Sequence, residues 1–147
     1  MEENTKFSCC ISNSDPATPL GMTVWLDDQQ VWTSDHITES TTVEFSLPDD
    51  EDQSHEIRFC MTGKTSAHTK IDDQGRIVKD AVLTIDRVFF DEIEIPQLTM
   101  TEHSVYRHDF NGHQSWVDDK FYGSMGCNGV LTFKFTTPIY LWLLEHT

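Results

Sequence analysis

The sequence predicts an all-β fold, a two-sheet antiparallel β-sandwich of jelly-roll type with about eight or nine strands. Three observations support this class: apolar and polar residues alternate along many short segments, turn residues interrupt the chain at short intervals, and no window carries a clear helical stripe. Alternation with a period of two places one face of a strand on a core and the other in water. The length of 147 residues suits one domain, so we expect a single sandwich over 1–147 with a mobile N-terminal arm at 1–4.

The alternating segments come, in chain order, at 22–27, 42–47, 55–62 and 131–136. In the second of them, Val43, Phe45 and Leu47 share one face, which we expect to lie on the core. The stretch 81–95 is long enough for two strands or one bent strand. Its alternation changes phase near 89–90, and a phase change within a strand predicts a β-bulge.

Short turns separate these segments. The Asn-Gly pairs at 111–112 and 128–129 predict tight hairpins, because both central residues of a type I′ turn need a positive φ. The segment 139–146, directly after Pro138, is the best helical candidate but fits a last strand equally well. The sequence leaves these two alternatives open.

The charge of the chain excludes several classes of partner. With 25 acidic and 10 basic residues, the formal net charge is −15, which disfavours nucleic acids and anionic membranes. The longest apolar run, 139–144, is far shorter than the roughly 18 to 20 residues of a membrane span. The first residues are acidic and no apolar segment follows them, so we expect no signal peptide and no membrane insertion.

Two motifs that carry chemistry in other proteins are incomplete here. Residues 63–65 (Gly-Lys-Thr) look like the end of a phosphate-binding loop, but Arg58 stands where that motif needs its first glycine. His103, His108 and His113 are regularly spaced, yet a spacing of five along a strand places neighbours on opposite faces. We therefore expect neither a nucleotide site nor a zinc site.

One cysteine has neighbours that leave an enzymatic alternative open. Cys127 lies in a Gly-Cys-Asn-Gly segment at 126–129, and His108 and Asp109 are of the right type to act as a base and an orienting group. This keeps a small hydrolase as a second alternative, although we predict a protein that is not an enzyme. We expect all four cysteines to be reduced, with Cys60 and Cys127 in or near the packed interior.

Acidic turns gather in the middle of the chain. An Asp-Asp-Gln-Gly turn at 72–75 is followed by further aspartates around the next predicted strand. Calcium takes about six to eight oxygen ligands, which carboxylates of adjoining loops can supply. The candidate calcium (Ca2+) ligands are Asp72, Asp73, Asp80 and Asp86. The alternative is that these residues form solvated turns that need no metal.

Aromatic side chains either stack on the faces of sugars or fill a core. The candidates for a ligand-binding face lie beside turns or on the polar side of a strand, and they are Trp25, Trp32, Trp116 and Tyr122. In the C-terminal apolar run, Tyr140 and Trp142 are candidates for contact with a partner, because exposed apolar patches usually mark such contacts. Structural packing is the alternative for each of them.

Part of the chain resembles a family of sugar-binding domains. The segments VWLD at 24–27 and DAVLTID at 80–86, with a strand beginning at His55, are similar to the small β-sandwich carbohydrate-binding modules that hold xylan through calcium. The resemblance covers roughly the first two thirds of the chain. It implies that Asp80 is a calcium ligand and that Asp86 has a structural or supporting role. The loop at 62–79 departs from the family's ligand loop.

A second resemblance concerns the C-terminal third. The segments DFNG at 109–112, FYGSMGCNG at 121–129 and FTTPIYLWLLE at 135–145 look like small proteins encoded by contractile-tailed marine phages of cyanobacteria. With residues 63–65 and 80–85, this resemblance covers most of the chain. It implies a virion-associated role, in the virion or in the host cytoplasm during assembly.

Together these features predict a protein that works by binding. The favoured hypothesis is a phage virion structural or accessory domain, on capsid or tail, whose partners are other virion proteins or surface glycans. The alternative is a calcium-dependent carbohydrate-binding module. A homo-oligomer is compatible with both hypotheses.

Overall fold

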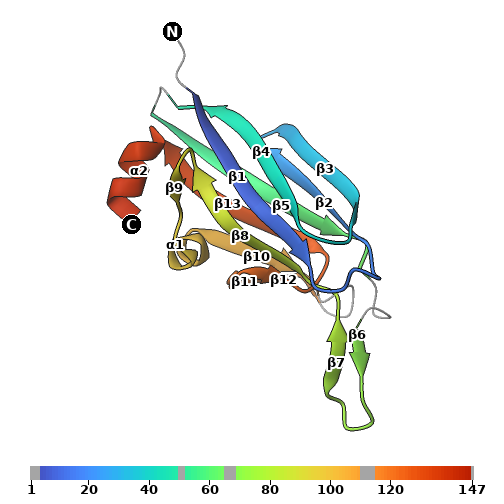
Figure 1. Cartoon of the computed structure of the whole chain (residues 1–147). Helices are drawn as coiled ribbons and strands as arrows, with labels where there is room; N and C mark the ends of the chain where they lie inside the picture. Colours follow the sequence, from blue (N-terminus) through green and yellow to red (C-terminus); the bar gives the residue numbers. More distant parts are fainter. Residues whose placement is uncertain (1–3, 50–51, 65–68, 110–114, 147) are drawn as a thin grey trace.

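The computed structural model describes residues 4–49, 52–64, 69–109 and 115–146, which form two antiparallel sheets packed face to face (Figure 1). One sheet has the strand order β12-β8-β1-β4, with β9 paired to β8. Its strands are β1 (Asn4–Asn13), β4 (Thr41–Pro48), β8 (Leu83–Phe90), β9 (Ile93–Glu94) and β12 (Ser124–Met125). The predicted two-sheet β-sandwich is therefore confirmed.

The other sheet has six strands in the order β11-β10-β13-β5-β2-β3. Its strands are β2 (Leu20–Leu26), β3 (Gln29–Ile37), β5 (Gln53–Thr62), β10 (Ser104–His108), β11 (Val117–Asp119) and β13 (Gly129–Thr137). The described residues contain more strands than the sequence predicted, because short pieces such as β9, β11 and β12 add to the sheet edges.

The core lies between the two sheets and is rich in phenylalanine. The ring of Phe7 on β1 lies 5.0 Å from that of Phe45 and 5.4 Å from that of Phe90, measured between centroids. The predicted alternation is confirmed in β4, where Val43 and Leu47 are buried and Phe45 is partly buried against the core. Burial of such apolar side chains is the main term that stabilises a sandwich of this kind.

A β-bulge interrupts β8, as predicted, but it lies earlier than residues 89–90. Asp86 and Arg87 are both exposed between the buried Ile85 and Val88. Opposite them, the register against β1 shifts, and Arg87 has a φ of 51°. Two consecutive outward-facing residues are what changes the phase of the alternation.

The Asn-Gly pair at 128–129 does not form the predicted type I′ turn, because Gly129 is the first residue of β13 and lacks a positive φ. A Cβ atom at Gly129 would lie 2.3 Å from the carbonyl oxygen of Arg107. The glycine is therefore needed for the close approach of β10, not for turn geometry. The other pair, at 111–112, lies outside the described residues.

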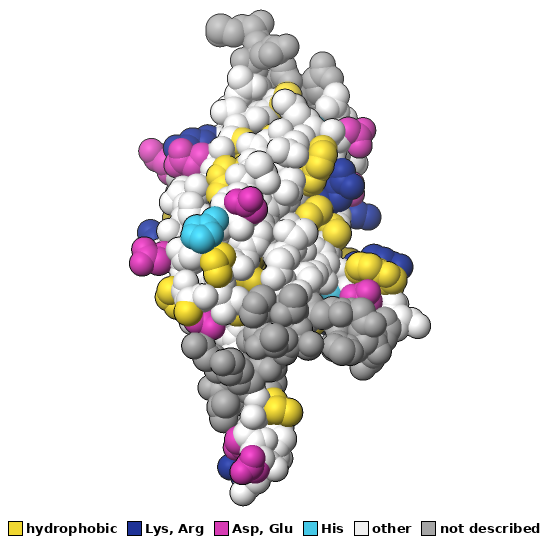
Figure 2. All heavy atoms as spheres, turned by 90° about the vertical axis from the view of Figure 1, so that its right-hand side faces the viewer, with side chains coloured by type: hydrophobic (Ala, Val, Ile, Leu, Met, Phe, Trp, Pro, Cys, Tyr) yellow, Lys and Arg dark blue, Asp and Glu magenta, His cyan; other side chains and the backbone are white. Residues whose placement is uncertain are grey.

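A two-stranded hairpin projects from one end of the sandwich (Figure 1). It consists of β6 (Thr69–Ile71) and β7 (Ile77–Asp80), which pair only with each other. At its tip, Asp72 Oδ1 accepts hydrogen bonds from the backbone N–H groups of Gln74 and Arg76, at 2.9 and 3.0 Å. Figure 2 shows this hairpin below the sandwich, with acidic side chains near its tip.

Two helices complete the described fold. α1 (Gln97–Glu102) joins β9 to β10, and α2 (Ile139–His146) follows β13. The C-terminal segment is therefore a helix, which settles the alternative that the sequence left open. The helix begins at Ile139, whose backbone N–H donates a hydrogen bond to Asp49 Oδ1 at 2.5 Å. No helix among the described residues is long and apolar enough to cross a membrane.

Candidate ligand-binding grooves

Two grooves bring polar and aromatic side chains together. The first, which we call the Tyr122 groove, has two lobes that share Asp119, Lys120 and Tyr122 as a common wall. One lobe, of about 560 Å3, is also lined by Tyr106, His108, Ser124, Gly126 and Cys127. The other lobe, of about 530 Å3, is also lined by Leu98, Thr101, Glu102, Ser104, Val105 and Asp118.

Tyr122 lies on the segment that crosses from β11, at the edge of one sheet, to β12, at the edge of the other. Its neighbour Phe121 is fully buried in the core, whereas Tyr122 itself is exposed. Gly123 follows with a φ of 105°, which an L-residue rarely adopts. Tyr122 is 75% exposed and lines both lobes.

Hydrogen bonds hold the first lobe in shape. His108 Nε2 lies 2.7 Å from Asp119 Oδ2, and the His108 side chain is buried. The hydroxyl of Tyr106 donates to the carbonyl of Cys127 and accepts from its backbone N–H at 2.9 Å. Burial raises the pKa of the Tyr106 hydroxyl well above its usual range, so it stays protonated in this role.

The second lobe has one side wall from α1 and contains an unusual hydroxyl. Ser104 is buried, lines this lobe, and its Oγ has no hydrogen-bond partner among the described residues. Buried polar groups are normally hydrogen-bonded, so this hydroxyl is an exception; its oxygen has almost no accessible surface, and a ligand in the lobe does not reach it in this structure. Nearby, Arg107 Nη1 donates to Asp118 Oδ1 at 3.0 Å, which orients one carboxylate of the rim.

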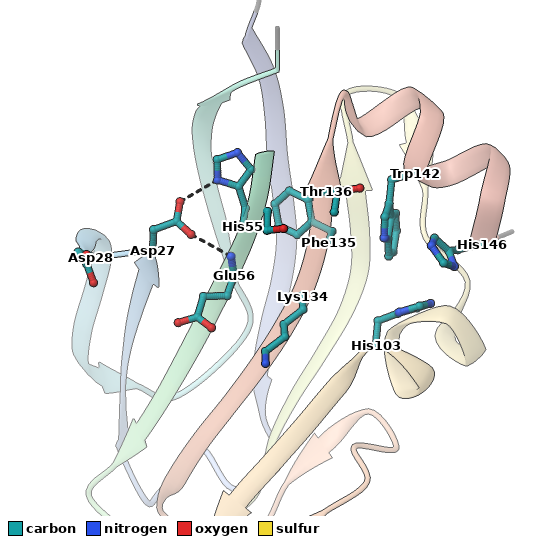
Figure 3. A pocket seen from close by; sticks show the side chains of 11 residues that line it. Asp27, Asp28, His55, Glu56, His103, Lys134, Phe135, Thr136, Trp142 and His146 are labelled. Carbon is teal, nitrogen blue, oxygen red and sulfur yellow. Dashed lines mark hydrogen bonds and ion pairs between the residues drawn. The ribbon is translucent and has the colours of Figure 1, made fainter. Parts of the chain in front are cut away.

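The second site, which we call the His103 groove, has a volume of about 670 Å3 (Figure 3). Its residues come from the adjacent strands β10, β13, β5 and β2, or the turns beside them, and from α2. They are Asp27, Asp28, Ser54, His55, Glu56, His103, Lys134, Phe135, Thr136, Trp142 and His146.

Asp27 organises one side of the His103 groove, as the dashed lines of Figure 3 show. Its Oδ2 lies 2.7 Å from His55 Nδ1, and its Oδ1 accepts the backbone N–H of Glu56 at 2.9 Å. Asp27 adopts a φ of 52°, a conformation that aspartate tolerates better than most residues. The buried Nε2 atom of His55 has no partner among the described residues.

The other side of the His103 groove is a packed cluster of rings. Trp142 is only 4% exposed and is surrounded by Phe133, Phe135, His103 and His146, with ring centroids 4.8 to 6.3 Å away. Burial, together with the neighbouring His146, lowers the pKa of His103 below its usual value. The groove therefore offers carboxylates and imidazoles but no exposed aromatic face.

The structure does not bring the four predicted calcium ligands together. Asp72 and Asp73 lie at the hairpin tip and Asp80 at its base, about 10 Å away along β7. Asp86 lies on β8, opposite Cys10. Oxygens that share one calcium ion lie within about 5 Å of each other. Among the residues that the structure describes, no three His, Cys, Asp or Glu side chains are grouped to hold a metal ion, so these residues do not fit calcium.

The predicted aromatic residues occupy different surroundings. The guanidinium of Arg58 lies over the ring of Trp25, with its Cζ atom 5.9 Å from the ring centroid. In the same way, the guanidinium of Arg107 lies over the ring of the exposed Trp116, with its Cζ atom 5.8 Å from the ring centroid. Trp32 is partly buried and packs against the core. Among these four candidates, Tyr122 is the one that lines a described groove.

The two predicted partner-contact residues separate on α2. Tyr140 is exposed, whereas Trp142 packs inside the chain between β13 and His103. A helix turns neighbouring side chains in different directions, so residues two apart cannot share one face. Only Tyr140 is presented to a partner, because the chain itself covers Trp142.

The surroundings of Cys127 disfavour its thiolate form. The residue is half-buried, and burial raises the pKa of its thiol above the usual value, although the nearby Lys64 opposes this shift. The thiolate is the reactive form of cysteine, so a raised pKa lowers reactivity at neutral pH. Among the cysteines, Cys9 is the buried one, whereas Cys60 is only partly buried.

Sequence reasoning missed most of the polar residues of the Tyr122 groove. Asp119 and Lys120 are neighbours in the chain, whereas Ser104 lies on another segment, and no motif connects the two. The available signal was local: a large apolar residue, an aromatic residue and a glycine at 121–123 are typical of a side chain held outward at a turn.

Comparison with known proteins extends the description of the fold. No family model and no curated protein matches the chain. The chain is similar to a solved selenomethionine form of vCBM60, described in work on a circular permutation linking two families of calcium-dependent carbohydrate-binding modules. The identity is 12%, the TM-score is 0.52, and the match covers 89% of this chain and 90% of that chain. A structure of vCBM60 in complex with galactobiose is also 12% identical, with a TM-score of 0.48 over 87% and 96% of the chains.

The first of these likenesses shows that the chain shares the β-sandwich fold of vCBM60. At 12% identity it supports the fold and leaves calcium and ligand to be argued from this chain's own residues. This likeness does not test the virion role, so the resemblance to phage proteins stays a prediction.

Proposed function

We propose that this protein is a non-enzymatic carbohydrate-binding module that binds a neutral oligosaccharide in the Tyr122 groove. The observation that carries the proposal is the exposed Tyr122, which lies between two lobes that also contain polar side chains. The fold of a carbohydrate-binding module agrees with it.

The chemistry of the groove matches that of a sugar ring. One face of a pyranose presents C–H groups, which pack on an aromatic ring, while its hydroxyls point outward at the edge. Around Tyr122, the carboxylate of Asp119 accepts hydrogen bonds and the ammonium of Lys120 donates them. Two lobes on either side of one ring fit at least two consecutive sugar units.

Charge selects among saccharides. The net charge of −15 disfavours sulfated or uronic-acid polymers, because the long-range field of the protein repels them. The proposed ligands are therefore neutral chains such as xylan or galactan.

The test is affinity electrophoresis in native gels cast with neutral polysaccharides, using the wild type and Tyr122→Ala. We expect at least one polysaccharide to retard the wild type, and Tyr122→Ala to bind at least about tenfold more weakly, because the stacking surface is lost. Tyr140→Ala is the matched control, since it removes an exposed tyrosine that is outside both grooves. Failure of every neutral polysaccharide to retard the wild type would overturn the proposal, as would equal retardation of wild type and Tyr122→Ala.

The virion role predicted from the sequence depends on a different surface. α2 exposes Tyr140, Leu141 and Leu144, which form the apolar surface that a particle protein would cover. This role and sugar binding are compatible, because α2 does not line the Tyr122 groove.

A further inference from the structure

Lys64 places its ammonium group inside the protein, at the junction of three segments. Its side chain is only 1% exposed. The ammonium donates to Asp80 Oδ1 at 2.5 Å and to the carbonyl oxygen of Gly126 at 2.6 Å. The backbone of Lys64 is held as well, because its N–H and C=O bond to the side-chain amide of Asn128 at 2.9 and 2.7 Å.

The three segments are otherwise distant in the chain. Lys64 follows β5, Asp80 ends β7, and Gly126 lies in the turn between β12 and β13. Gly126 also lines the first lobe of the Tyr122 groove. The buried ammonium therefore fastens one wall of the groove to the base of the projecting hairpin.

A cation in this position does what a bound calcium ion does elsewhere. Calcium joins loops by attracting carboxylate and carbonyl oxygens to one point, and here the same two kinds of oxygen converge on Lys64. Burying a charge is unfavourable unless it is paired and hydrogen-bonded, and Asp80 supplies the opposite charge. The ammonium also repels a second cation, because both would compete for the Asp80 carboxylate.

We propose that the Lys64 ammonium replaces a structural calcium ion in this carbohydrate-binding-module fold, so that the wall of the Tyr122 groove is ordered without metal. The solved protein of the same fold belongs to work on calcium-dependent modules, so this assignment separates the chain from its structural neighbour. The consequence for ligand affinity rests on the proposed sugar-binding function, whereas the consequence for stability does not.

The stability test compares thermal unfolding in EDTA and in millimolar calcium. We expect the melting temperature of the wild type to be the same in both, within about 1 °C, and that of Lys64→Met to be lower by about 5 °C or more in both. Lys120→Met is the matched control, because Lys120 is exposed, and it should change the melting temperature by about 1 °C or less. A wild type that calcium stabilises and EDTA destabilises would overturn the proposal.

A double variant tests whether Lys64→Met is destabilised because it leaves the Asp80 charge unpaired. Replacing the pair together, as Lys64→Met with Asp80→Leu, removes both charges and leaves neither unpaired. We expect the double variant to regain most of the melting temperature that the single variant loses. A double variant no more stable than Lys64→Met alone would contradict the role of the ion pair.

A second experiment tests ligand binding and repeats the affinity electrophoresis with EDTA in the gel. Retardation of the wild type should be unchanged by EDTA, and loss of retardation in EDTA would overturn the proposal. If no polysaccharide retards the protein in any condition, the sugar-binding function fails, and the melting temperatures alone decide the role of Lys64.

Discussion

At the residue scale, Asp27 joins a turn to the neighbouring strand. Its two carboxylate oxygens bond to His55 Nδ1 and to the Glu56 backbone, and its positive φ closes the turn between β2 and β3. The buried His55 ring depends on Asp27 for its one hydrogen bond among the described residues. Asp27 therefore has a structural role in the His103 groove, because both of its carboxylate oxygens are already engaged within the protein.

We expect Asp27→Ala to lower the free energy of unfolding by about 1–3 kcal/mol, because a buried imidazole loses its partner. Urea unfolding followed by circular dichroism measures this change. The neighbouring Asp28→Ala is the control, since Asp28 is exposed and should stay within about 0.5 kcal/mol of the wild type. Equal losses in the two variants would contradict the role assigned to Asp27.

His103 should make stability depend on pH. Burial first, and then the nearby His146, lower the pKa of His103 in the folded protein below the value of 6.5 expected for a free histidine. The unfolded chain then binds the proton more readily, so this contribution is fully present above about pH 6.5 and is lost as the pH falls through the folded-state pKa.

Urea midpoints at about pH 7.5 and about pH 5.5 test this dependence. The loss of stability on acidification should be smaller in His103→Gln than in the wild type. His36→Gln serves as the control, because His36 lies on an exposed part of β3, and it should lose as much as the wild type. An unchanged pH dependence in His103→Gln would show that other groups cause it.

At the scale of the elements, the close contact between β10 and β13 requires a glycine, which has no side chain, at position 129. The backbone of Gly129 pairs with His108, and a Cβ there would lie 2.3 Å from the Arg107 carbonyl oxygen. This oxygen belongs to the backbone of a paired strand, so it cannot move aside without breaking the ladder.

We expect Gly129→Ala to lower the free energy of unfolding by about 1–3 kcal/mol or more, because the strands must separate to admit the methyl group. Gly126→Ala is a close control: its Cβ would meet Val82 Cγ1 at 3.6 Å, which is ordinary contact. Chemical denaturation of both variants measures the difference. Similar stabilities would show that the strands adjust more easily than this packing indicates.

At the scale of the whole molecule, the sandwich and the projecting hairpin are built differently. β6 and β7 pair only with each other, and Ile71 at the end of β6 is exposed. A two-stranded hairpin is at best marginally stable by itself. Asp80 ends β7, and its ion pair with Lys64, which follows β5, ties the base of the hairpin to the sandwich.

We expect replacement of residues 66–78 by a short Gly-Ser linker to leave the sandwich folded, with a cooperative thermal transition and unchanged near-ultraviolet circular dichroism. The physical reason is that none of the core residues identified in the described part of the chain lies in that segment. A broad or absent transition would show that the hairpin contributes to the stability of the sandwich.

Several features of this protein could be determined from the sequence alone. Alternation of side chains is a local property of a strand, so residues such as Val43, Leu47 and Phe133 could be assigned to the core, and the two-sheet sandwich followed. The bulge in β8 was predicted for the same reason, although its position was three residues away from Asp86 and Arg87. The helix at 139–146 stayed undecided, because six apolar residues in a row carry no period.

The tertiary structure decided which distant residues meet. The acidic residues that the sequence grouped into one calcium site lie on different parts of the fold, whereas Lys64, which had no assigned role, meets Asp80 and Gly126. Likewise, Tyr122 became a groove residue only when β11 and α1 were placed around it. Strand patterns depend on neighbours along the chain, but sites depend on the order of strands in the sheets, which spacing in the sequence does not encode.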